Sequence, residues 1–258
     1  MENEYRPRTL KMSKMTEETP DVYTIEMDSK NEGRAGQFYM LSVPGVGEAP
    51  ISVASGFGRN LIFTIRDVGS VTSKLKNLQF VGIRGPYGTG WPWKEYDEVI
   101  GVAGGIGIPP IRSLLEEMMD SGRQQDLEVM YGARTPSDLV YKTDFGDWTK
   151  SLNFQITVDT ANAEWNGNVG FVPALLRKAH LSRMAAVFVI GPPLMMINTV
   201  KEALKLGYRE DRIFISLERR MECGIGVCGH CNIGEHYVCE SGPIINYSRV
   251  RNDKELFL

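Results

Sequence analysis

The stretch "EVIGVAGGIGIPPIRSLLEEMMDSG" (residues 98–122) joins an apolar run, a glycine-rich turn and a helical pattern. The apolar run is short and uninterrupted, which is typical of a strand buried on both faces. After the turn, apolar residues recur at three- and four-residue intervals, as they do on a helix with one buried face. A strand that leads directly into a helix predicts a unit of a parallel α/β sheet.

The same alternation continues after this stretch. Three further runs read as buried strands, "DLEVMYGAR" (126–134), "NFQITVDT" (153–160) and "AAVFVIGPP" (185–193). Helical stretches such as "VPALLRKAHL" (172–181) and "LMMINTVKEALKLG" (194–207) separate or follow them. Strands that alternate with helices predict a parallel sheet, so we assign residues 96–212 to an α/β domain.

The chain before this stretch has a different pattern. Short β-branched or aromatic runs, bounded by Gly, Pro, Asn or Asp, recur at "DVYTIEMD" (21–28), "GQFYMLSV" (36–43), "NLIFTIRDV" (60–68) and "VGIRGPYG" (81–88). Regularly spaced short strands without a long helical pattern predict a small β-barrel over residues 1–95. The remaining tail, residues 213–258, contains every cysteine of the chain.

Composition narrows the class of protein. The chain has 258 residues, 42% hydrophobic and 24% charged, with a formal net charge of −3. These values are typical of a globular protein of about two domains, and nucleic-acid binding is not expected because it needs a basic surface. The charged N-terminal segment does not resemble a secretory signal, and the apolar runs are too short to span a membrane. We therefore predict a cytoplasmic protein, whose clustered cysteines bind metal rather than form disulfides.

The cysteines follow the spacing C-x4-C-x2-C-x7-C, at Cys223, Cys228, Cys231 and Cys239. The first three match the spacing of plant-type [2Fe–2S] proteins, which need four thiolates. Structural zinc also takes four cysteines, but these usually come as two separated C-x2-C pairs. His230 and His236 are interpreted as solvated loop residues, because four cysteines already complete a ligand set. The spacing favours an iron–sulfur cluster.

Two glycine-rich turns precede predicted helices. In the first, Gly104, Gly105 and Gly107 follow a strand, so backbone N–H groups at a helix start could hold a pyrophosphate. The full G-x-G-x-x-G pattern is absent, because Pro110 occupies its third glycine position. The second turn, "GPP" at 191–193, has the same design. Such turns also occur simply to let strands and helices pack closely, and both interpretations stay open.

The barrel segment "IRDVGSVTSKL" (65–75) places glycine and hydroxyl side chains after a strand. Amides and hydroxyls in this arrangement suit phosphate oxygens. A hairpin turn with a helix cap explains the same residues. Taken alone, the segment favours the turn and helix cap.

Taken together, these segments resemble the ferredoxin–NADP reductase superfamily, in its branch of iron–sulfur flavoprotein electron-transfer subunits. The resemblance covers nearly the whole chain, and it is carried by "GQFYMLSVPGVGEAPIS" (36–52), "AGGIGIPPI" (103–111) and "ERRMECGIGVCGHCNIGEHYVCESGPIINY" (218–247). The branch includes electron-transfer subunits of dihydroorotate dehydrogenase, gamma subunits of sulfhydrogenase and B subunits of anaerobic sulfite reductase. "GEAPIS", "CGHC" and "SGPIINY" are most similar to the sulfite reductase subunits.

The resemblance implies a cofactor role for each matching position. The flavin motif matches Ala49, Pro50, Ile51 and Ser52, and of these Ile51 would back the isoalloxazine ring and Ser52 would hydrogen-bond it. The next flavin-contacting strand matches Thr64, Ile65 and Arg66, and the turn that holds the FAD diphosphate matches Gly69, Ser70, Val71 and Thr72. The nicotinamide dinucleotide site matches Gly104, Gly105, Ile106, Gly107, Gly191 and Pro192. The [2Fe–2S] ligands match Cys223, Cys228, Cys231 and Cys239.

Two positions depart from the family pattern. The arginine that often meets the FAD diphosphate is Ala49 here, and a cysteine near the nicotinamide is replaced by Ile190. We therefore expect Arg66, Lys74 and the amides of residues 69–72 to meet the diphosphate charge. The second departure affects only details of the hydride geometry.

The preferred nicotinamide is marked less clearly. Arg134 and Arg112 follow predicted strands near the expected adenosine ribose, where an arginine accommodates a 2′-phosphate. Either residue is equally explained as a solvated surface charge. The resemblance implies NADH.

The order of cofactors predicts the function. A nicotinamide gives two electrons as a hydride and a cluster accepts one at a time, so FAD must lie between them. No acid–base pair is required, and we predict no catalytic side chain. We predict a subunit that oxidises NAD(P)H and passes electrons to iron–sulfur catalytic subunits of a multi-subunit reductase or hydrogenase. An anaerobic sulfite reductase is favoured; the alternatives are a cytoplasmic NiFe hydrogenase (sulfhydrogenase) and dihydroorotate dehydrogenase.

Two other classes of protein remain as alternatives. One is a flavin-free redox sensor that uses the cluster, and the other is a zinc-stabilised adaptor that uses the barrel as a binding surface. For an electron-transfer subunit, a partner should cover one face of residues 223–243. Five apolar residues of the tail favour such a face, Ile233, Tyr237, Ile244, Ile245 and Tyr247. About half of them are expected to pack onto the protein's own domains instead.

Overall fold

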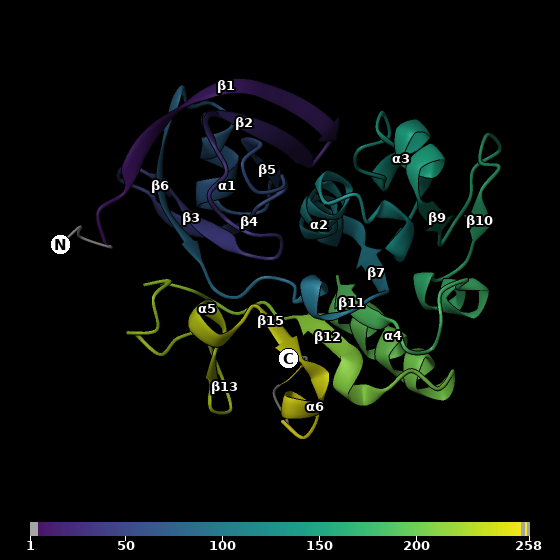
Figure 1. Cartoon of the computed structure of the whole chain (residues 1–258). Coiled ribbons are helices and arrows are strands. Elements are labelled where there is room, and N and C mark those ends of the chain that lie inside the picture. Colours follow the sequence, from purple (N-terminus) through teal and green to yellow (C-terminus); the bar gives the residue numbers. More distant parts are fainter. Residues whose placement is uncertain (1–4, 254–255, 257–258) are drawn as a thin grey trace.

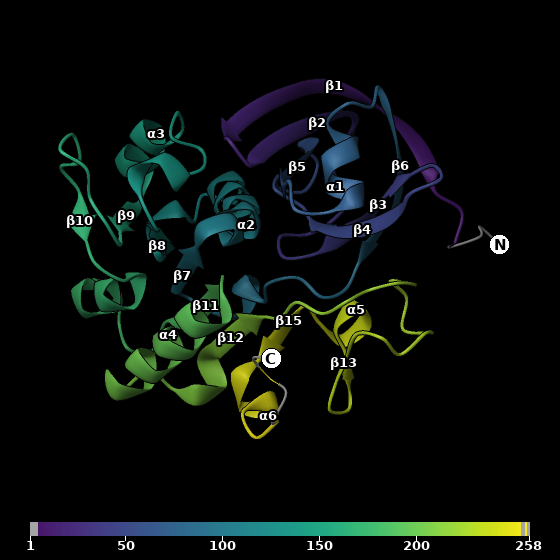
Figure 2. The same ribbon diagram turned by 180° about the vertical axis from the view of Figure 1, so that it is seen from behind.

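Two β-sheets, one antiparallel and one mainly parallel, lie on either side of helix α2 (Ile108–Asp120). The computed structural model describes residues 5–253 and Leu256. Figure 1 shows the antiparallel sheet in purple and blue, the parallel sheet in teal and green, and the cysteine-bearing tail in yellow. Seen from behind, α2 again lies between the two sheets (Figure 2). The predicted fold class, a β-barrel followed by a parallel α/β domain and a small C-terminal module, is confirmed.

The antiparallel sheet has six strands in the order β4-β3-β6-β1-β2-β5. They are β1 (Arg8–Thr19), β2 (Val22–Lys30), β3 (Phe38–Val43), β4 (Gly47–Ser52), β5 (Asn60–Arg66) and β6 (Phe80–Tyr87). The sheet rolls up until its edge strands meet at a bridge between Val53 and Phe63. Short helix α1 (Ser70–Leu75) contacts β3 and β4, and with the inward side chains of the strands it fills the barrel core.

The second sheet has the order β10-β9-β8-β7-β11-β12-β15. Its strands are β7 (Val99–Gly104), β8 (Leu127–Ala133), β9 (Asn153–Val158), β10 (Asn168–Val169), β11 (Ala186–Ile190), β12 (Ile213–Ser216) and β15 (Ile244–Asn246). All neighbours run parallel except β12 and β15. The chain moves outward from β7 to β9 and then returns to place β11 on the other side of β7. The strand order therefore reverses between β7 and β11.

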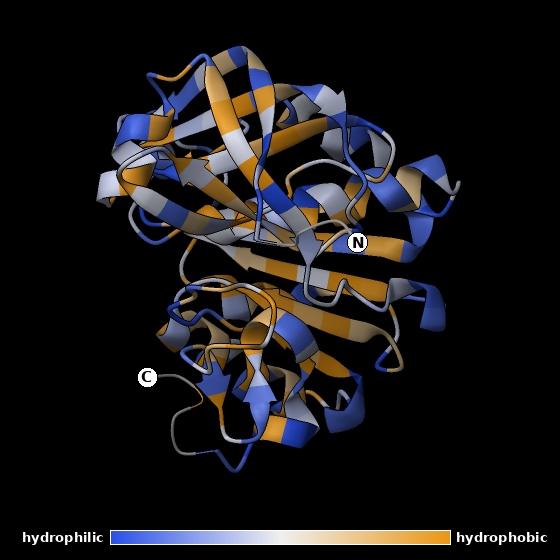
Figure 3. Ribbon diagram, turned by 90° about the vertical axis from the view of Figure 1, so that its left-hand side faces the viewer, coloured by the Kyte–Doolittle hydropathy of each residue, from blue (hydrophilic) through white to orange (hydrophobic). Residues whose placement is uncertain are grey.

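Both faces of this sheet are covered, which explains why its strands are apolar throughout. Helices α2 and α3 (Phe145–Ser151) belong to the hydrophobic core on one face, and α4 (Pro193–Lys205) and η5 (Val172–Lys178) to the core on the other. Strands near the centre of the molecule are mainly orange in Figure 3, the colour of hydrophobic residues. The stretch predicted to be helical at 172–181 is a 3₁₀ helix that ends at Lys178.

Several shorter elements complete the described chain. They are the 3₁₀ helices η1 (Trp93–Glu95), η2 (Gly105–Gly107), η3 (Gln124–Asp126), η4 (Pro136–Asp138) and η6 (Glu210–Arg212), the helices α5 (Val238–Ser241) and α6 (Tyr247–Val250), and the hairpin of β13 (Asn232–Ile233) and β14 (His236–Tyr237). None of the helices within residues 5–253 has the length and apolar character needed to cross a membrane.

The tail is joined to both sheets. Strand β15 pairs with β12, so the parallel sheet extends beyond residue 212, where we placed the domain boundary. At the barrel, the Thr89 hydroxyl donates to the carbonyl of Ile244 at 3.0 Å, and Thr89 also forms a bridge with Pro243. These contacts hold the cysteine-bearing segment between the two sheets.

Helix α2 fixes the barrel to the α/β domain with two carboxylates. Glu116 accepts the backbone N–H of Gly56, and Glu117 accepts that of Ala35, both at 2.7 Å. The indole N–H of Trp93 also donates to Glu117, at 3.1 Å. Charge-assisted hydrogen bonds to a partly buried carboxylate are among the stronger polar contacts of proteins. The orientation of the two domains is therefore set by specific bonds as well as by apolar packing.

Candidate functional site

A cavity of about 800 Å³ lies at the carboxyl ends of β7 and β11. This is the point where the strand order reverses, the usual ligand position in an open parallel sheet. Four of the predicted nucleotide residues line it, Gly104, Gly105, Ile106 and Pro192. The barrel contributes Thr19, Asp21, Val22 and Arg66. A ligand in this cavity would therefore touch both domains.

The two glycine-rich turns pack against each other beside the cavity. A Cβ atom on Gly107 would lie 2.8 Å from the carbonyl oxygen of Ile190, too close for any other residue. Gly191 has a φ of +149° and lies against the backbone of Gly104, where a Cβ would be 3.0 Å from the nitrogen. Close packing of the turns, one of the two interpretations of these glycines, is thus observed. The cavity beside the turns is also compatible with the other interpretation, in which their backbone N–H groups bind a pyrophosphate.

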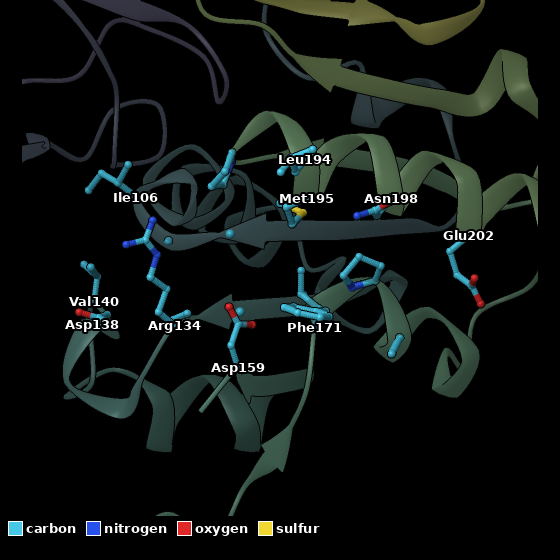
Figure 4. A pocket seen from close by; sticks show the side chains of 18 of the residues that line it. Ile106, Arg134, Asp138, Val140, Asp159, Phe171, Leu194, Met195, Asn198 and Glu202 are labelled. Atoms are coloured by element: carbon cyan, nitrogen blue, oxygen red, sulfur yellow. The ribbon is translucent and has the colours of Figure 1, made fainter. Parts of the chain in front are cut away.

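Charged side chains lie along the cavity wall. Arg134 follows β8 and Asp159 follows β9, and Figure 4 shows both side chains directed into the cavity. Burial raises the pKa of Asp159, although the charge of Arg134 opposes this effect. The other arginine expected near the adenosine ribose, Arg112, lies elsewhere. Its guanidinium pairs with Glu116 at 2.9 Å, at the interface between α2 and the barrel.

The predicted flavin segments lie along the two edges of the barrel sheet. Residues 49–52 belong to β4 and residues 64–66 to β5, the outermost strands. Within the described residues, β4 and β5 approach each other at a single bridge, between Val53 and Phe63. Apart from this bridge, the edge of β4 that faces away from β3 and the edge of β5 that faces away from β2 are not paired with another strand. The turn of residues 69–72 follows β5 and starts α1. The barrel therefore has an open seam flanked by all three predicted flavin segments.

Side chains of β4 alternate between the two faces of the sheet. Residues Ala49 to Ser52 are all half buried, and Ala49 and Ile51 are on the side that packs against the barrel core. Ile51, expected to back the isoalloxazine ring, therefore contacts the core and is also partly exposed. The backbone edge of β4 and the exposed parts of these side chains remain available to a ligand at the seam.

Thr64, on the other edge of the seam, is a buried member of a partly buried ring of hydrogen bonds. Its hydroxyl shares hydrogen bonds with Thr24 and with the hydroxyl of Tyr141 from the α/β domain. Glu18 closes the ring, because its carboxylate accepts the Thr24 hydroxyl at 2.8 Å and the Tyr141 backbone N–H at 3.0 Å. Tyr141 has a φ of +63°, which is uncommon outside glycine. The ring joins three barrel strands to the nucleotide domain.

The expected phosphate contacts are partly engaged within the chain. The Arg66 Nε donates to Asp21 at 2.8 Å, and both side chains are about half exposed at the cavity wall. Hydrogen bonds from Arg66 lower the pKa of Asp21. The Thr72 hydroxyl accepts the N–H of Gly69 at 2.9 Å, so this residue caps the start of α1. The helix-cap interpretation is thus observed, and a diphosphate would have to use the remaining amides.

The four cysteines approach each other in two pairs. The sulfur atoms of buried Cys231 and Cys239 lie 3.3 Å apart, and the Cys228 N–H donates to the sulfur of Cys223 at 3.4 Å. The Gly226 N–H also donates to Cys239 at 3.1 Å. A two-iron cluster needs two thiolates for each iron, and N–H groups aimed at sulfur stabilise its negative charge. These residues therefore fit an iron–sulfur cluster.

The thiols differ in acidity and in exposure. Burial, reinforced by the Cys231 thiol, raises the pKa of Cys239 to about 12. The backbone of His230, followed by that of Cys223, lowers the pKa of the exposed Cys228. Because a metal binds the thiolate, loading would require Cys239 to release its proton. His230 is half exposed, in keeping with a loop residue rather than a ligand.

Several residues at these sites were not identified from the sequence. Asp159 ends a predicted strand, a place where an acidic residue could have been considered. Tyr141 and Arg84 carry no local signal, because both act through contacts with segments more than 70 residues away. Among the five apolar tail residues, Ile233, Ile244 and Ile245 are buried in the protein's own core. Tyr237 stays exposed, and so does Val227, which no sequence pattern had marked.

Comparisons with known proteins agree with this division of the chain. The family model described as "Oxidoreductase NAD-binding domain" matches residues 102–202. A second model, "Iron-sulfur cluster binding domain of dihydroorotate dehydrogenase B", matches residues 218–251. The two matches cover the segments that hold the cavity turns and the four cysteines.

Relatives that match nearly the whole of this chain are known as well. Sulfhydrogenase 1 subunit gamma of Pyrococcus furiosus is 34% identical over 94% of this chain and 90% of its own length. A probable dihydroorotate dehydrogenase B (NAD(+)) electron transfer subunit of Pyrococcus abyssi is 35% identical over 95% and 92%. The solved structure of an NADH-dependent reduced ferredoxin–NADP oxidoreductase has a TM-score of 0.80 at 24% identity, covering 96% of this chain and 91% of that one. This last likeness establishes the fold alone.

Replacing Cys228 by Ser should remove the cluster and spare most of the flavin, because the two sites use different segments. Iron, acid-labile sulfide and flavin should be measured on anaerobically purified protein. Val227→Ala alters the neighbouring exposed side chain and should keep all three. Full iron and sulfide in Cys228→Ser, or zinc in place of iron in the unmodified chain, would contradict the cluster assignment.

Arg66→Ala should weaken FAD binding about tenfold or more, since a charge-assisted contact to phosphate is worth roughly 1.5–3 kcal/mol. Asp21→Asn is the matched variant, because it frees Arg66 from its carboxylate partner and should bind FAD at least as tightly. Titration of FAD into the flavin-free proteins measures both. Equal FAD affinity in Arg66→Ala and the unmodified chain would show that backbone amides suffice.

Proposed function

The chain belongs to the family of electron-transfer subunits that includes the sulfhydrogenase gamma and dihydroorotate dehydrogenase B subunits, and we propose that it oxidises NADH for a separate catalytic partner. One observation carries the proposal. The nucleotide cavity, the barrel seam and the paired thiols occur in one chain and adjoin each other, with Arg66 between the first two and the Glu48–Arg84 pair between the last two. Electrons would pass through these sites in that order.

The cavity suits a nicotinamide dinucleotide. The turn that leads into α2 lines the cavity with Gly104, Gly105 and Ile106, whose backbone N–H groups could meet a pyrophosphate; Pro109 and Pro110, at the start of the helix itself, have none. Phe171 and Leu194 are more than 70% exposed and both line the cavity, so they offer apolar surface to an adenine ring. Figure 4 shows them on opposite walls. The end of the cavity formed by Asp21 and Arg66 leaves the nicotinamide next to the seam.

FAD is assigned to the seam. Bound there, it would accept a hydride and give up electrons singly, which neither a nicotinamide nor a cluster can do. The residues of the chain hold and orient it: the β4 edge and Ser52 on one side, β5 on the other, and Arg66 toward the diphosphate. The α2 carboxylates keep the two domains at a fixed distance, so the nicotinamide and flavin rings would be held in position for hydride transfer.

Electrons would leave the chain through the cysteine-bearing loop, residues 223–239. We assign a [2Fe–2S] cluster to the two thiol pairs, with the pair of Cys231 and Cys239 facing inward. Cys228 and Val227 are exposed, and Val227 is 69% accessible. An electron would therefore leave through this edge of the loop, and a partner would cover it together with Tyr237. A reducing compartment such as the cytoplasm would keep the four thiols free to bind iron.

For the partner, we propose the catalytic subunits of an anaerobic sulfite reductase. This choice rests on the motifs "GEAPIS", "CGHC" and "SGPIINY" in the sequence. A hydrogenase or dihydroorotate dehydrogenase partner is the alternative, and the relatives described above favour it. Sequence identities of 34% and 35% to subunits of two different complexes do not separate the acceptors, so an assay must.

The chain should prefer NADH over NADPH, because the Asp159 carboxylate would accept a hydrogen bond from the ribose 2′-hydroxyl and repel a 2′-phosphate. Asp159→Asn should lower the ratio of kcat/KM for NADH to that for NADPH about tenfold, a change of about 1.4 kcal/mol.

Asp138→Asn is the control for this prediction. Asp138 also lines the cavity, but its carboxylate accepts the Thr135 N–H and hydroxyl at 3.0 and 2.7 Å. Its replacement should leave the ratio unchanged. A preference for NADPH in the unmodified chain, or an equal drop in both variants, would refute the role of Asp159.

The isolated chain should reduce artificial acceptors with NADH and should not reduce sulfite. Adding anaerobic sulfite reductase catalytic subunits should give NADH-dependent sulfite reduction, and Cys228→Ser should abolish this coupling while keeping flavin-dependent dye reduction. Parallel assays measure hydrogen evolution and dihydroorotate oxidation with the corresponding catalytic subunits. Coupling to one of those systems and not to sulfite reductase would overturn the choice of partner. Sulfite reduction by the chain alone would overturn the role of a subunit.

A further inference from the structure

Arg84 is a buried cation at the contact between the barrel and the cysteine-bearing loop. It lies in β6, and its side chain is only 3% exposed. One Nη atom donates to the carbonyl oxygen of Cys223 at 3.0 Å. The same Nη lies 3.3 Å from the Tyr87 hydroxyl, and the guanidinium lies over the Tyr87 ring, 5.7 Å from its centre.

The other side of the guanidinium is held by Glu48. Arg84 Nε donates to one carboxylate oxygen at 3.0 Å, and the second Nη contacts the other oxygen. Glu48 also accepts the hydroxyl of Ser42. Burial acts to raise the pKa of Glu48, but the hydrogen bonds from Arg84 and Ser42 outweigh it and keep the pKa below its ordinary value. The two side chains therefore form a charged pair.

This pair connects the two proposed cofactor sites. Glu48 directly precedes the flavin motif in β4, and Cys223 is the first thiol of the cluster loop. Gly224, the next residue, has a φ of +76° and lies against β3, where a Cβ would be 3.0 Å from the Cγ of Met40. The loop thus rests on the barrel through backbone groups. The bonds from Glu48 to Arg84 to Cys223 form a continuous link from the flavin strand to a cluster ligand.

We propose that Arg84 is a positioning residue for electron transfer from the flavin to the cluster. This inference rests on the function proposed above. Its hydrogen bond fixes the Cys223 loop against the flavin strand, and its buried charge favours the reduced cluster, which carries one more negative charge. One electron moves from flavin to cluster, and the guanidinium stays protonated throughout. Glu48 holds the guanidinium in place and cancels part of its charge.

The charge part of the proposal predicts opposite effects for the two partners. Arg84→Gln should lower the equilibrium constant for reduction of the cluster about tenfold, which is about 59 mV for one electron. Glu48→Gln should raise it, because Arg84 then lacks its counter-charge. Arg220→Gln is the control, since this arginine is close to Cys223 in sequence but its side chain is 82% exposed and screened by water. The cluster potential is measured by redox titration monitored by electron paramagnetic resonance.

The positioning part is tested with Arg84→Lys, which keeps the charge but loses the planar fork that reaches Glu48 and Cys223 together. After rapid mixing with NADH, its flavin should be reduced at the normal rate and its cluster several-fold more slowly. In the metal-free chain, amide hydrogen exchange of residues 223–228 should be faster in Arg84→Gln than in the Arg220→Gln control. Loss of iron and sulfide from Arg84→Gln with flavin retained supports the same role, and Glu48→Gln then carries the test of the charge.

Three results would overturn the proposal: shifts of the same sign in Arg84→Gln and Glu48→Gln, an unchanged cluster potential in both, or a normal rate of cluster reduction in Arg84→Lys. Failure of the proposed function gives a different result, namely an unmodified chain that binds no flavin or no iron–sulfur cluster. Iron, sulfide and flavin contents of the unmodified chain are therefore measured first.

Discussion

The hydrogen bonds from the barrel backbone to the α2 carboxylates are the contact on which the arrangement of sites depends. Glu116 and Glu117 are neighbours on one helix, yet they accept N–H groups from two separate barrel loops, at Gly56 and Ala35. A carboxylate at such an interface must be satisfied, because leaving it without donors costs far more than its bonds contribute. These bonds therefore favour the observed orientation of the barrel on α2. That orientation brings Asp21 and Arg66 to the edge of the nucleotide cavity and turns the seam toward it.

The tail depends on this arrangement in turn. It adds β15 to the parallel sheet and bonds to the barrel at Thr89 and Arg84, so its position is defined only when both domains are in place. A loop with so many glycines has high conformational entropy when free, and contacts at both ends reduce the number of conformations that a metal would have to select. Part of the site is accordingly in place in this structure, with the sulfur atoms of Cys231 and Cys239 together and N–H groups directed at the sulfur of Cys223 and Cys239.

Much of this could be predicted from local patterns. Apolar and β-branched runs identified β2, β3, β5 and β6 of the barrel and β7, β8, β9 and β11 of the second sheet, and the cysteine spacing marked the cluster loop, because each of these signals lies within a few consecutive residues. Strand β1 was not identified, because most of its side chains are exposed and it contains no apolar run. Arg112 could not be placed, since its position on α2 allows it to face either the cavity or the barrel, and the burial of Glu116 decides between them. The orientation of Ile51 depends on which face of β4 meets the barrel core. Tyr141 and Arg84 gain their roles from partners that are distant in sequence, which no local pattern describes. Asp159 differs from them, because its place at the end of β9 is itself a local signal.

The ring of Glu18, Thr24, Thr64 and Tyr141 has a consequence for how substrates enter and leave. Opening a cleft between the domains would break this ring and expose its buried polar groups, besides releasing the α2 carboxylates. A hinged enzyme uses such an opening to admit a nucleotide and to expel the product. Here the hydrogen bonds hold the barrel and the α/β domain together, so turnover would have to use the solvent-exposed side of the cavity. The dinucleotide would enter and leave past the exposed side chains of Phe171 and Leu194. Exchange of the dinucleotide would then need only side-chain motion, on a nanosecond timescale, rather than the slower movement of whole domains.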